Sequence, residues 1–153
     1  MANTYSQIYI HIVFSVQDRL NLIPKQHREE LHKIITGIVS NRKQKLISIF
    51  AMPDHVHLLV GLKPNMPLSD LVRDIKAGSS KYITEKRWVK GKFNWQEGYG
   101  SFSYSRSQIS HVVNYILTQE YHHKKKTFRE EYIDILKKFE VDYDEKFLFD
   151  WIE

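Results

Sequence analysis

Residues 45–62 read KLISIFAMPDHVHLLVGL and contain two apolar segments separated by a Met-Pro-Asp turn. Both segments, 45–52 and 55–62, are rich in β-branched and other apolar residues, which predicts two strands joined as a hairpin. Side chains alternate along a strand, so the valines and leucines at every second position of the second segment form one unbroken apolar face. His55 and His57 point to the opposite face. We expect the apolar face to pack beneath helices and the histidine face to stay open.

Further strand-like and helix-like segments lie on both sides of this hairpin. Sequence patterns predict additional strands at 5–16 and 101–105, and helices at 24–41, 68–88, 108–123 and 127–139. The first six elements run strand, helix, strand, strand, helix, strand, which is the ferredoxin-like, RRM-like split βαβ plan. We therefore predict an α+β fold in which a four-stranded antiparallel sheet carries two helices on one face and two more helices follow.

Length and composition limit the class of protein. A chain of 153 residues suits one domain with a single core, so we expect residues 1–153 to form one domain. The absence of cysteine excludes disulfides, thiolate metal sites and a cysteine nucleophile. The first residues lack the features of a secretory signal, and no apolar run approaches the roughly 20 residues of a membrane span. We expect a cytoplasmic protein that does not enter membranes.

The charge is distributed unevenly along the chain. The net charge is +5, but six of the 18 acidic residues and only one basic residue follow Phe139, so residues 1–139 carry a net charge of +10. A basic body with an acidic tail favours a polyanionic partner such as nucleic acid. The alternative is an ordinary soluble surface with surplus lysine.

Two groups of polar side chains could form a site. Imidazoles two residues apart on one strand face, His55 and His57, lie close enough to share a cation, although this spacing alone is a weak motif. On the expected helix 108–123, Tyr115 and Gln119 are one turn apart and point in the same direction. Gln119 could add a third ligand, whereas a tyrosine at this spacing is also typical of ordinary packing.

Several separated motifs resemble one family. The run 52–60, MPDHVHLLV, looks like the histidine–hydrophobic–histidine (HUH) motif, and 95–103, WQEGYGSFS, is similar to the stretch that precedes that family's catalytic helix. Residues 114–123, NYILTQEYHH, resemble the catalytic helix, and 9–15 also match. The family is that of the single-tyrosine HUH transposases of peel-and-paste insertion sequences (the insertion-sequence transposase A family and its REP-associated tyrosine transposase relatives).

The resemblance implies a metal-dependent DNA strand transferase that cuts and rejoins single-stranded DNA at insertion-sequence ends. Carried over position by position, it makes Tyr115 the nucleophile that forms a 5′-phosphotyrosine, and His55, His57 and Gln119 the ligands of a divalent cation, Mg2+ or Mn2+. A phenol with a pKa near 10 is ionised in only about one molecule in a thousand at neutral pH, so withdrawal of charge from the phosphate by the cation would compensate. Because phosphoester bonds are exchanged, no nucleotide cofactor is expected.

The same resemblance implies particular partners and a division of the chain. It implies hairpin DNA as the ligand and a homodimer in which the tyrosine helix of one subunit completes the histidine site of the other, in a nucleoid-associated protein. The sheet and two helices would occupy residues 1–105, the tyrosine helix 106–123, and the last helix with the acidic tail 127–153. Expected DNA contacts are His11, Arg42, Lys43, Lys45, Lys76, Lys81, Lys86, Arg87, Lys90, Lys92 and Lys124 to Lys126.

Three alternative functions are compatible with the residues. A ferredoxin-like module could bind single-stranded RNA or DNA through aromatic and basic side chains without chemistry. A metal-dependent nuclease could use water in place of the tyrosine. A domesticated tyrosine transposase could process chromosomal repeats by the same chemistry.

Overall fold

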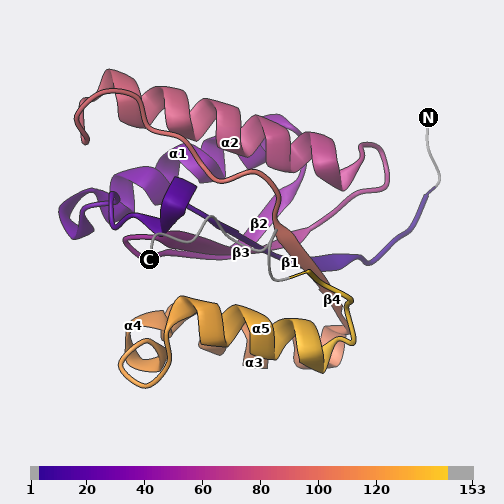
Figure 1. Cartoon of the computed structure of the whole chain (residues 1–153). Coiled ribbons are helices and arrows are strands. Elements are labelled where there is room, and N and C mark those ends of the chain that lie inside the picture. The colour runs from indigo at the N-terminus through magenta and orange to yellow at the C-terminus, as the bar shows by residue number, and fades with distance from the viewer. Residues whose placement is uncertain (1–3, 145–153) are drawn as a thin grey trace.

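The computed structural model describes residues 4–144, and its centre is a four-stranded antiparallel sheet with helices on both faces (Figure 1). The strands are β1 (Tyr9–Ser15), β2 (Lys45–Ala51), β3 (His55–Gly61) and β4 (Gly100–Tyr104). The helices are α1 (Arg28–Asn41), α2 (Leu68–Glu85), α3 (Ile109–Leu117), α4 (Gln119–His122) and α5 (Phe128–Lys138), with short 3-10 turns at Gln17–Arg19, Lys25–His27 and Arg106–Gln108. Within residues 4–144, no helix has the length and apolar character needed to cross a membrane.

The strand order β2-β3-β1-β4 confirms the predicted ferredoxin-like plan. The expected hairpin of β2 and β3 is present, and β1 pairs antiparallel with both β3 and β4. Helices α1 and α2 cover one face of the sheet, as Figure 1 shows above the strands. The predicted apolar face of β3 supplies Val56, Leu58 and Val60 to this core, and all three are fully buried.

The other face of the sheet, which we expected to stay open, is covered by α3, α4 and α5 (Figure 1). His55 and His57 are therefore fully buried. The physical reason is that this face also carries apolar side chains, since Leu59 packs against α3 and Val13 packs against α5. The expectation was wrong because a strand with two histidines still offers enough apolar surface to dock an amphipathic helix.

The expected helix 108–123 is divided in two. Helix α3 ends at Leu117, Thr118 leaves the helical conformation with φ −107° and ψ 27°, and α4 begins at Gln119. The Thr118 hydroxyl donates to the carbonyl of Asn114 at 2.8 Å, a bond to the preceding turn that tends to bend helices. The two polar residues expected on one helix, Tyr115 and Gln119, consequently lie on two successive helices.

Helix α5 begins as its sequence predicted and packs closely against β4. Thr127 and Glu130 form the expected capping box, with the Glu130 amide donating to Thr127 Oγ1 at 3.2 Å. Gly100 lies beneath Tyr132 of α5, and a Cβ atom at this glycine would be 2.6 Å from Tyr132 Oη. The acidic tail expected beyond α5 lies largely outside the described residues, which end at 144.

Candidate active site

The two histidines of β3 are held by hydrogen bonds at their Nδ1 atoms. His55 Nδ1 donates to Asp54 Oδ1 at 2.6 Å, and His57 Nδ1 lies 2.8 Å from Nε2 of His11 on the neighbouring strand β1. Both Nε2 atoms are therefore directed toward the helices that cover this face, where they lie near Glu131. A partner at the far ring nitrogen is what fixes the orientation of a metal-binding imidazole.

A carboxylate that sequence reasoning missed lies between these Nε2 atoms. Glu131 of α5 is buried, and its Oε1 is 3.2 Å from His57 Nε2 and 3.8 Å from His55 Nε2. His123 Nε2 is 3.1 Å from the same oxygen. One signal could have found it: Glu131 is an acidic residue on the helix face that also carries Phe128 and buries α5.

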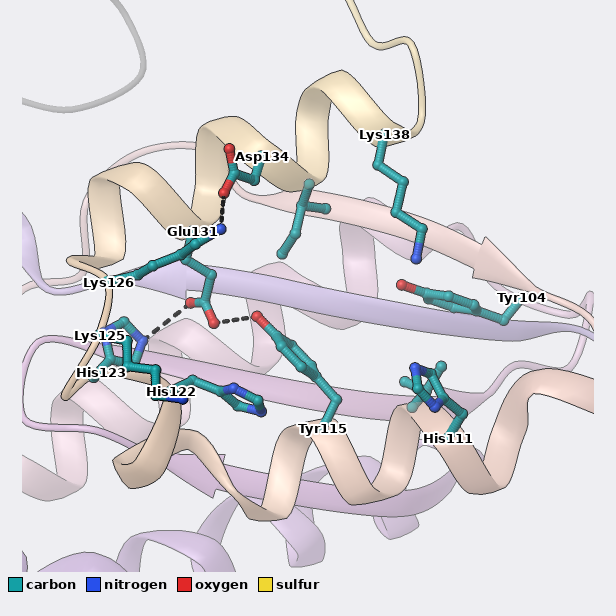
Figure 2. A pocket seen from close by; sticks show the side chains of 12 residues that line it. Tyr104, His111, Tyr115, His122, His123, Lys125, Lys126, Glu131, Asp134 and Lys138 are labelled. Carbon is teal, nitrogen blue, oxygen red and sulfur yellow. Dashed lines mark hydrogen bonds and ion pairs between the residues drawn. The ribbon is translucent and has the colours of Figure 1, made fainter.

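Tyr115 and Gln119 approach the same centre from α3 and α4. Tyr115 Oη donates a hydrogen bond to Glu131 Oε2, as Figure 2 shows, and its ring lies 5.9 Å from that of His57. Gln119 is fully buried, and its Oε1 is 3.5 Å from His55 Nε2. The structure thus brings together all four residues proposed for catalysis and metal binding, and does so within one chain.

Burial and charge set the protonation of this centre. Burial would raise the pKa of Glu131, but the surrounding imidazoles lower it much more, so the carboxylate is ionised. Burial, followed by the charge of Glu131, raises the pKa of Tyr115 well above its ordinary value. The phenol is therefore held protonated beside an anion. A cation bound among the same donors would have the opposite effect of charge and would favour the ionised form of Tyr115.

The donor set fits a divalent metal ion. Ligand atoms of His55, His57 and Glu131 all lie within 4.8 Å of one another. An octahedral ion with bonds of about 2.1 Å places neighbouring donors about 3 Å apart and opposite donors about 4.2 Å apart. Gln119 Oε1 adds a fourth oxygen or nitrogen donor to the group, and Asp54 and His11 hold the two imidazoles from behind.

Cavities flank this centre on two sides. One of about 310 Å³ lies between α3 and α5 and has Tyr115 and Glu131 in its wall (Figure 2). Another, of about 580 Å³, is lined by Asp54, His123 and Phe128 among others. Tyr115 and Glu131 therefore border the first cavity, whereas His55 and His57 line neither of the two.

The residues expected to contact DNA lie mostly away from Tyr115. His11 is fully buried behind His57, and the basic residues between 42 and 92 belong to α1, α2, β2 and their connections. Helices α1 and α2 cover the sheet face opposite to α3 (Figure 1). The part of a DNA strand that is bound at Tyr115 would therefore not contact the basic residues of α1 and α2. Lys125 and Lys126, by contrast, line the cavity beside Tyr115.

Several of these basic side chains already have protein partners, among them Lys81 with Glu85 and Lys126 with Asp134. Arg42 Nε donates to Asp74 Oδ2 at 2.7 Å. Lys76 donates to the carbonyl oxygens of Gln96 and Gly98, and burial lowers its pKa to about 8. Lys76 therefore anchors residues 96–98 to α2, while Lys43, Lys45, Lys86, Arg87, Lys90 and Lys92 are exposed.

Comparison with known proteins agrees with this geometry. The sequence pattern described as Transposase IS200 like matches residues 4–119. The chain belongs to the IS200-like transposase family. This membership makes it a relative of DNA-cleaving transposases, and it places α5 with Glu131 beyond the matched segment.

Individual relatives extend the comparison. The chain is similar to the ISDra2 transposase TnpA of Deinococcus radiodurans, with 26% identity over 120 residues that cover 74% of this chain and 84% of that protein. A crystal structure of a protein assigned as a transposase, from D. radiodurans R1, has a TM-score of 0.61 at 21% identity and covers 78% of this chain and 95% of its own. The structure of a REP-associated tyrosine transposase bound to a REP hairpin has a TM-score of 0.58 at 19% identity, covering 80% and 73%. These likenesses confirm the α+β fold.

Proposed function

We propose that this chain cuts and rejoins single-stranded DNA at insertion-sequence ends through a 5′-phosphotyrosine at Tyr115, with a divalent cation bound by His55 and His57. One observation supports this most strongly: Tyr115 Oη and the Nε2 atoms of both histidines converge on the single carboxylate of Glu131. A phenol beside a cation site has the two parts that covalent phosphoryl transfer requires, a nucleophile and a group that neutralises the phosphate.

The side chains suggest how the bond exchange proceeds. Tyr115 Oη attacks the phosphorus, the bond from phosphorus to the 3′ oxygen breaks, and the phenol proton is released to water, while Glu131 Oε2 positions the phenol by accepting its hydrogen bond. The departing oxygen takes a proton from water and becomes a free 3′-hydroxyl. When bound, the cation withdraws charge from the phosphate and stabilises the departing oxygen. Attack of another 3′-hydroxyl on the phosphotyrosine reverses the step and rejoins a strand, so no nucleotide cofactor is needed.

The donor chemistry favours Mn2+ over Mg2+. Imidazole suits transition metals, whereas Mg2+ prefers oxygen ligands and retains several waters. Two imidazoles with the oxygens of Glu131 and Gln119 form a mixed site. Titration calorimetry should show tighter binding of Mn2+ than of Mg2+, and loss of both in His57→Ala. Tighter binding of Mg2+ would contradict this choice of ion.

The decisive experiment uses single-stranded DNA from the flanks of the gene. Incubation with Mn2+ or Mg2+ followed by a denaturing gel should reveal a covalent protein–DNA species that Tyr115→Phe abolishes and chelation prevents. Tyr121→Phe is the matched control, because Tyr121 is an exposed tyrosine of the neighbouring helix α4. Cleavage that survives in Tyr115→Phe would indicate hydrolysis by water, and binding without any cleavage would indicate a binding module.

We further infer a homodimer that binds hairpin DNA in the cytoplasm, in association with the nucleoid. The REP-associated tyrosine transposase with a similar fold was captured on a REP hairpin, which supports the hairpin ligand. In this structure one chain supplies both Tyr115 and His57 to the site. A composite site would therefore form only if two copies exchanged the whole segment from α3 to α5, so that each copy placed its Tyr115 beside the histidines of the other. Mixing Tyr115→Phe with His57→Ala should then restore the covalent species, because one of the two composite sites is intact. Failure to restore it would show that each chain acts alone.

A further inference from the structure

The cavity of about 310 Å³ beside Tyr115 has a composition that the bond exchange does not by itself explain (Figure 2). Tyr115 and Glu131 border it, and Tyr104 of β4 stands at its other end. The side walls come from Val112 of α3 and Ile135 of α5. It is therefore a mainly apolar recess with aromatic and charged groups at defined points, which is typical of ligand pockets.

Three polar side chains of this cavity, Tyr104, His111 and Lys138, have no hydrogen-bond or ion-pair partner within residues 4–144. The Tyr104 hydroxyl makes no hydrogen bond there, and burial raises the pKa of Tyr104, so the hydroxyl remains a donor. Lys138 forms no ion pair in the same part of the chain, and its Nζ lies 5.8 Å from the centroid of the Phe139 ring. By comparison, Lys126 in the same cavity is paired with Asp134. The recess thus offers a ring, a hydroxyl donor and an unpaired ammonium to a ligand.

The size and chemistry of the cavity suit one nucleotide. Its volume lies at the small end of ligand cavities, which are roughly 300–1,000 Å³, so a duplex cannot enter it. Nucleobases stack on aromatic side chains, and phosphates bind lysine. A nucleotide joined to Tyr115 through its 5′-phosphate must stay beside the Tyr115 hydroxyl, and the larger cavity at Asp54 does not include Tyr115 in its lining.

We propose that this cavity holds the base of the nucleotide whose 5′-phosphate becomes joined to Tyr115, with Tyr104 as the stacking surface and Lys138 as a backbone contact. The inference rests on the proposed function and adds that the protein itself binds one base next to the cleavage point. Four of the twelve residues that line the cavity come from α5, which lies beyond the segment shared with the family pattern. The family match therefore does not account for this wall.

The test measures the rate of covalent adduct formation on oligonucleotides with one abasic position. Removing the base on the 3′ side of the scissile phosphate should slow the wild type by about 5- to 150-fold, the range expected for one stacked base. Tyr104→Leu should slow adduct formation on intact DNA to a similar extent. In this variant the abasic position should cause no further loss of rate. Tyr104→Phe keeps the ring and loses only the hydroxyl, so it should slow the reaction much less than Tyr104→Leu.

Lysine variants provide a second, matched comparison. Lys138→Gln should slow adduct formation and weaken its dependence on salt, because one phosphate contact is lost. Lys137→Gln, an exposed neighbour that does not line the cavity, should do neither.

The outcomes separate the inference from the proposed function. An adduct that forms equally fast without the 3′ base, or a penalty only for the 5′ base, overturns the inference and leaves the proposed function intact. The inference is also overturned if Tyr104→Leu and the abasic position slow adduct formation independently, so that their fold losses in rate multiply. If Tyr104→Leu does not fold, the abasic scan on the wild type still decides. No adduct with wild type under any condition overturns both.

Discussion

Replacing Gly100 with alanine tests how closely α5 must approach the sheet to place Glu131. A Cβ atom at this position would lie 2.6 Å from Tyr132 Oη and 2.7 Å from Tyr132 Cε1, both far inside van der Waals contact. Tyr132 cannot yield easily, since it is buried and stacks on Phe128 with the ring centroids 5.7 Å apart. Because Tyr132 follows Glu131 directly, any shift of α5 also moves the carboxylate away from the histidines.

The size of the effect follows from the contact. Adding a methyl group to a well-packed region costs about 1–3 kcal/mol of folding free energy. For a chain of this length, 1 kcal/mol corresponds to about 2–4 °C in melting temperature, so Gly100→Ala should lower Tm by about 2–12 °C. Backbone strain does not contribute, because Gly100 does not have a left-handed φ.

Calorimetry or circular dichroism on heating provides the assay. Gly37→Ala is the matched control: Gly37 lies in α1 with nothing within 4 Å of an added Cβ, so alanine should stabilise by about 0.5–1 kcal/mol. In the double variant Gly100→Ala with Tyr132→Leu, the shorter side chain should relieve the contact, making the combined loss smaller than the sum. A Gly100→Ala protein that melts like the wild type, or losses that simply add, would refute the reasoning.

Three further predictions concern the site and its surroundings. Asp54→Asn should weaken Mn2+ binding by about 10- to 100-fold in calorimetry, because the carboxylate orients His55, while Asp70→Asn on α2 should leave it unchanged. Burial lowers the pKa of His11 well below 6.5, so as the pH falls the unfolded chain binds a proton before the folded chain does. The free energy of unfolding, measured with urea, should therefore fall as the pH drops below about 6.5, and it should fall less in His11→Phe. The Lys76 amine should titrate near pH 8 by NMR, and a titration midpoint near 10.5 would contradict its burial. The free energy of unfolding should rise with pH from about 8 toward 10.5, and Lys76→Met should remove this rise.

Much of the fold was predictable because the deciding signals are local. The alternation in β3 separates valine and leucine from histidine, and this alone orients the strand between a helical layer and the site. The Thr127–Glu130 capping box likewise marked the start of α5. The split βαβ order then left a single plausible arrangement of four strands, which the structure confirms.

Other features depend on contacts between distant residues and had no local signal strong enough to reveal them. The covering of the histidine face depends on the docking of α3 and α5, and the break at Thr118 depends on one side chain bonding to the preceding turn. Glu131 reaches His57 across 74 residues of chain, so its role could only be suspected from an acidic residue on a buried helix face. His11 was expected to lie near the substrate. It lies behind His57 instead, and it is fully buried.

The sequence by itself determined which chemical groups are available: two imidazoles on one strand face, a phenol and an amide one turn apart, and a basic body. Periodicity and capping are properties of neighbouring residues, so they can be recognised without knowing the fold. Only the tertiary structure decided that these groups meet at the carboxylate of Glu131, and that a base-sized cavity opens next to the phenol. Those features arise from α5 packing on the sheet over Gly100, a long-range contact whose geometry no local pattern specifies.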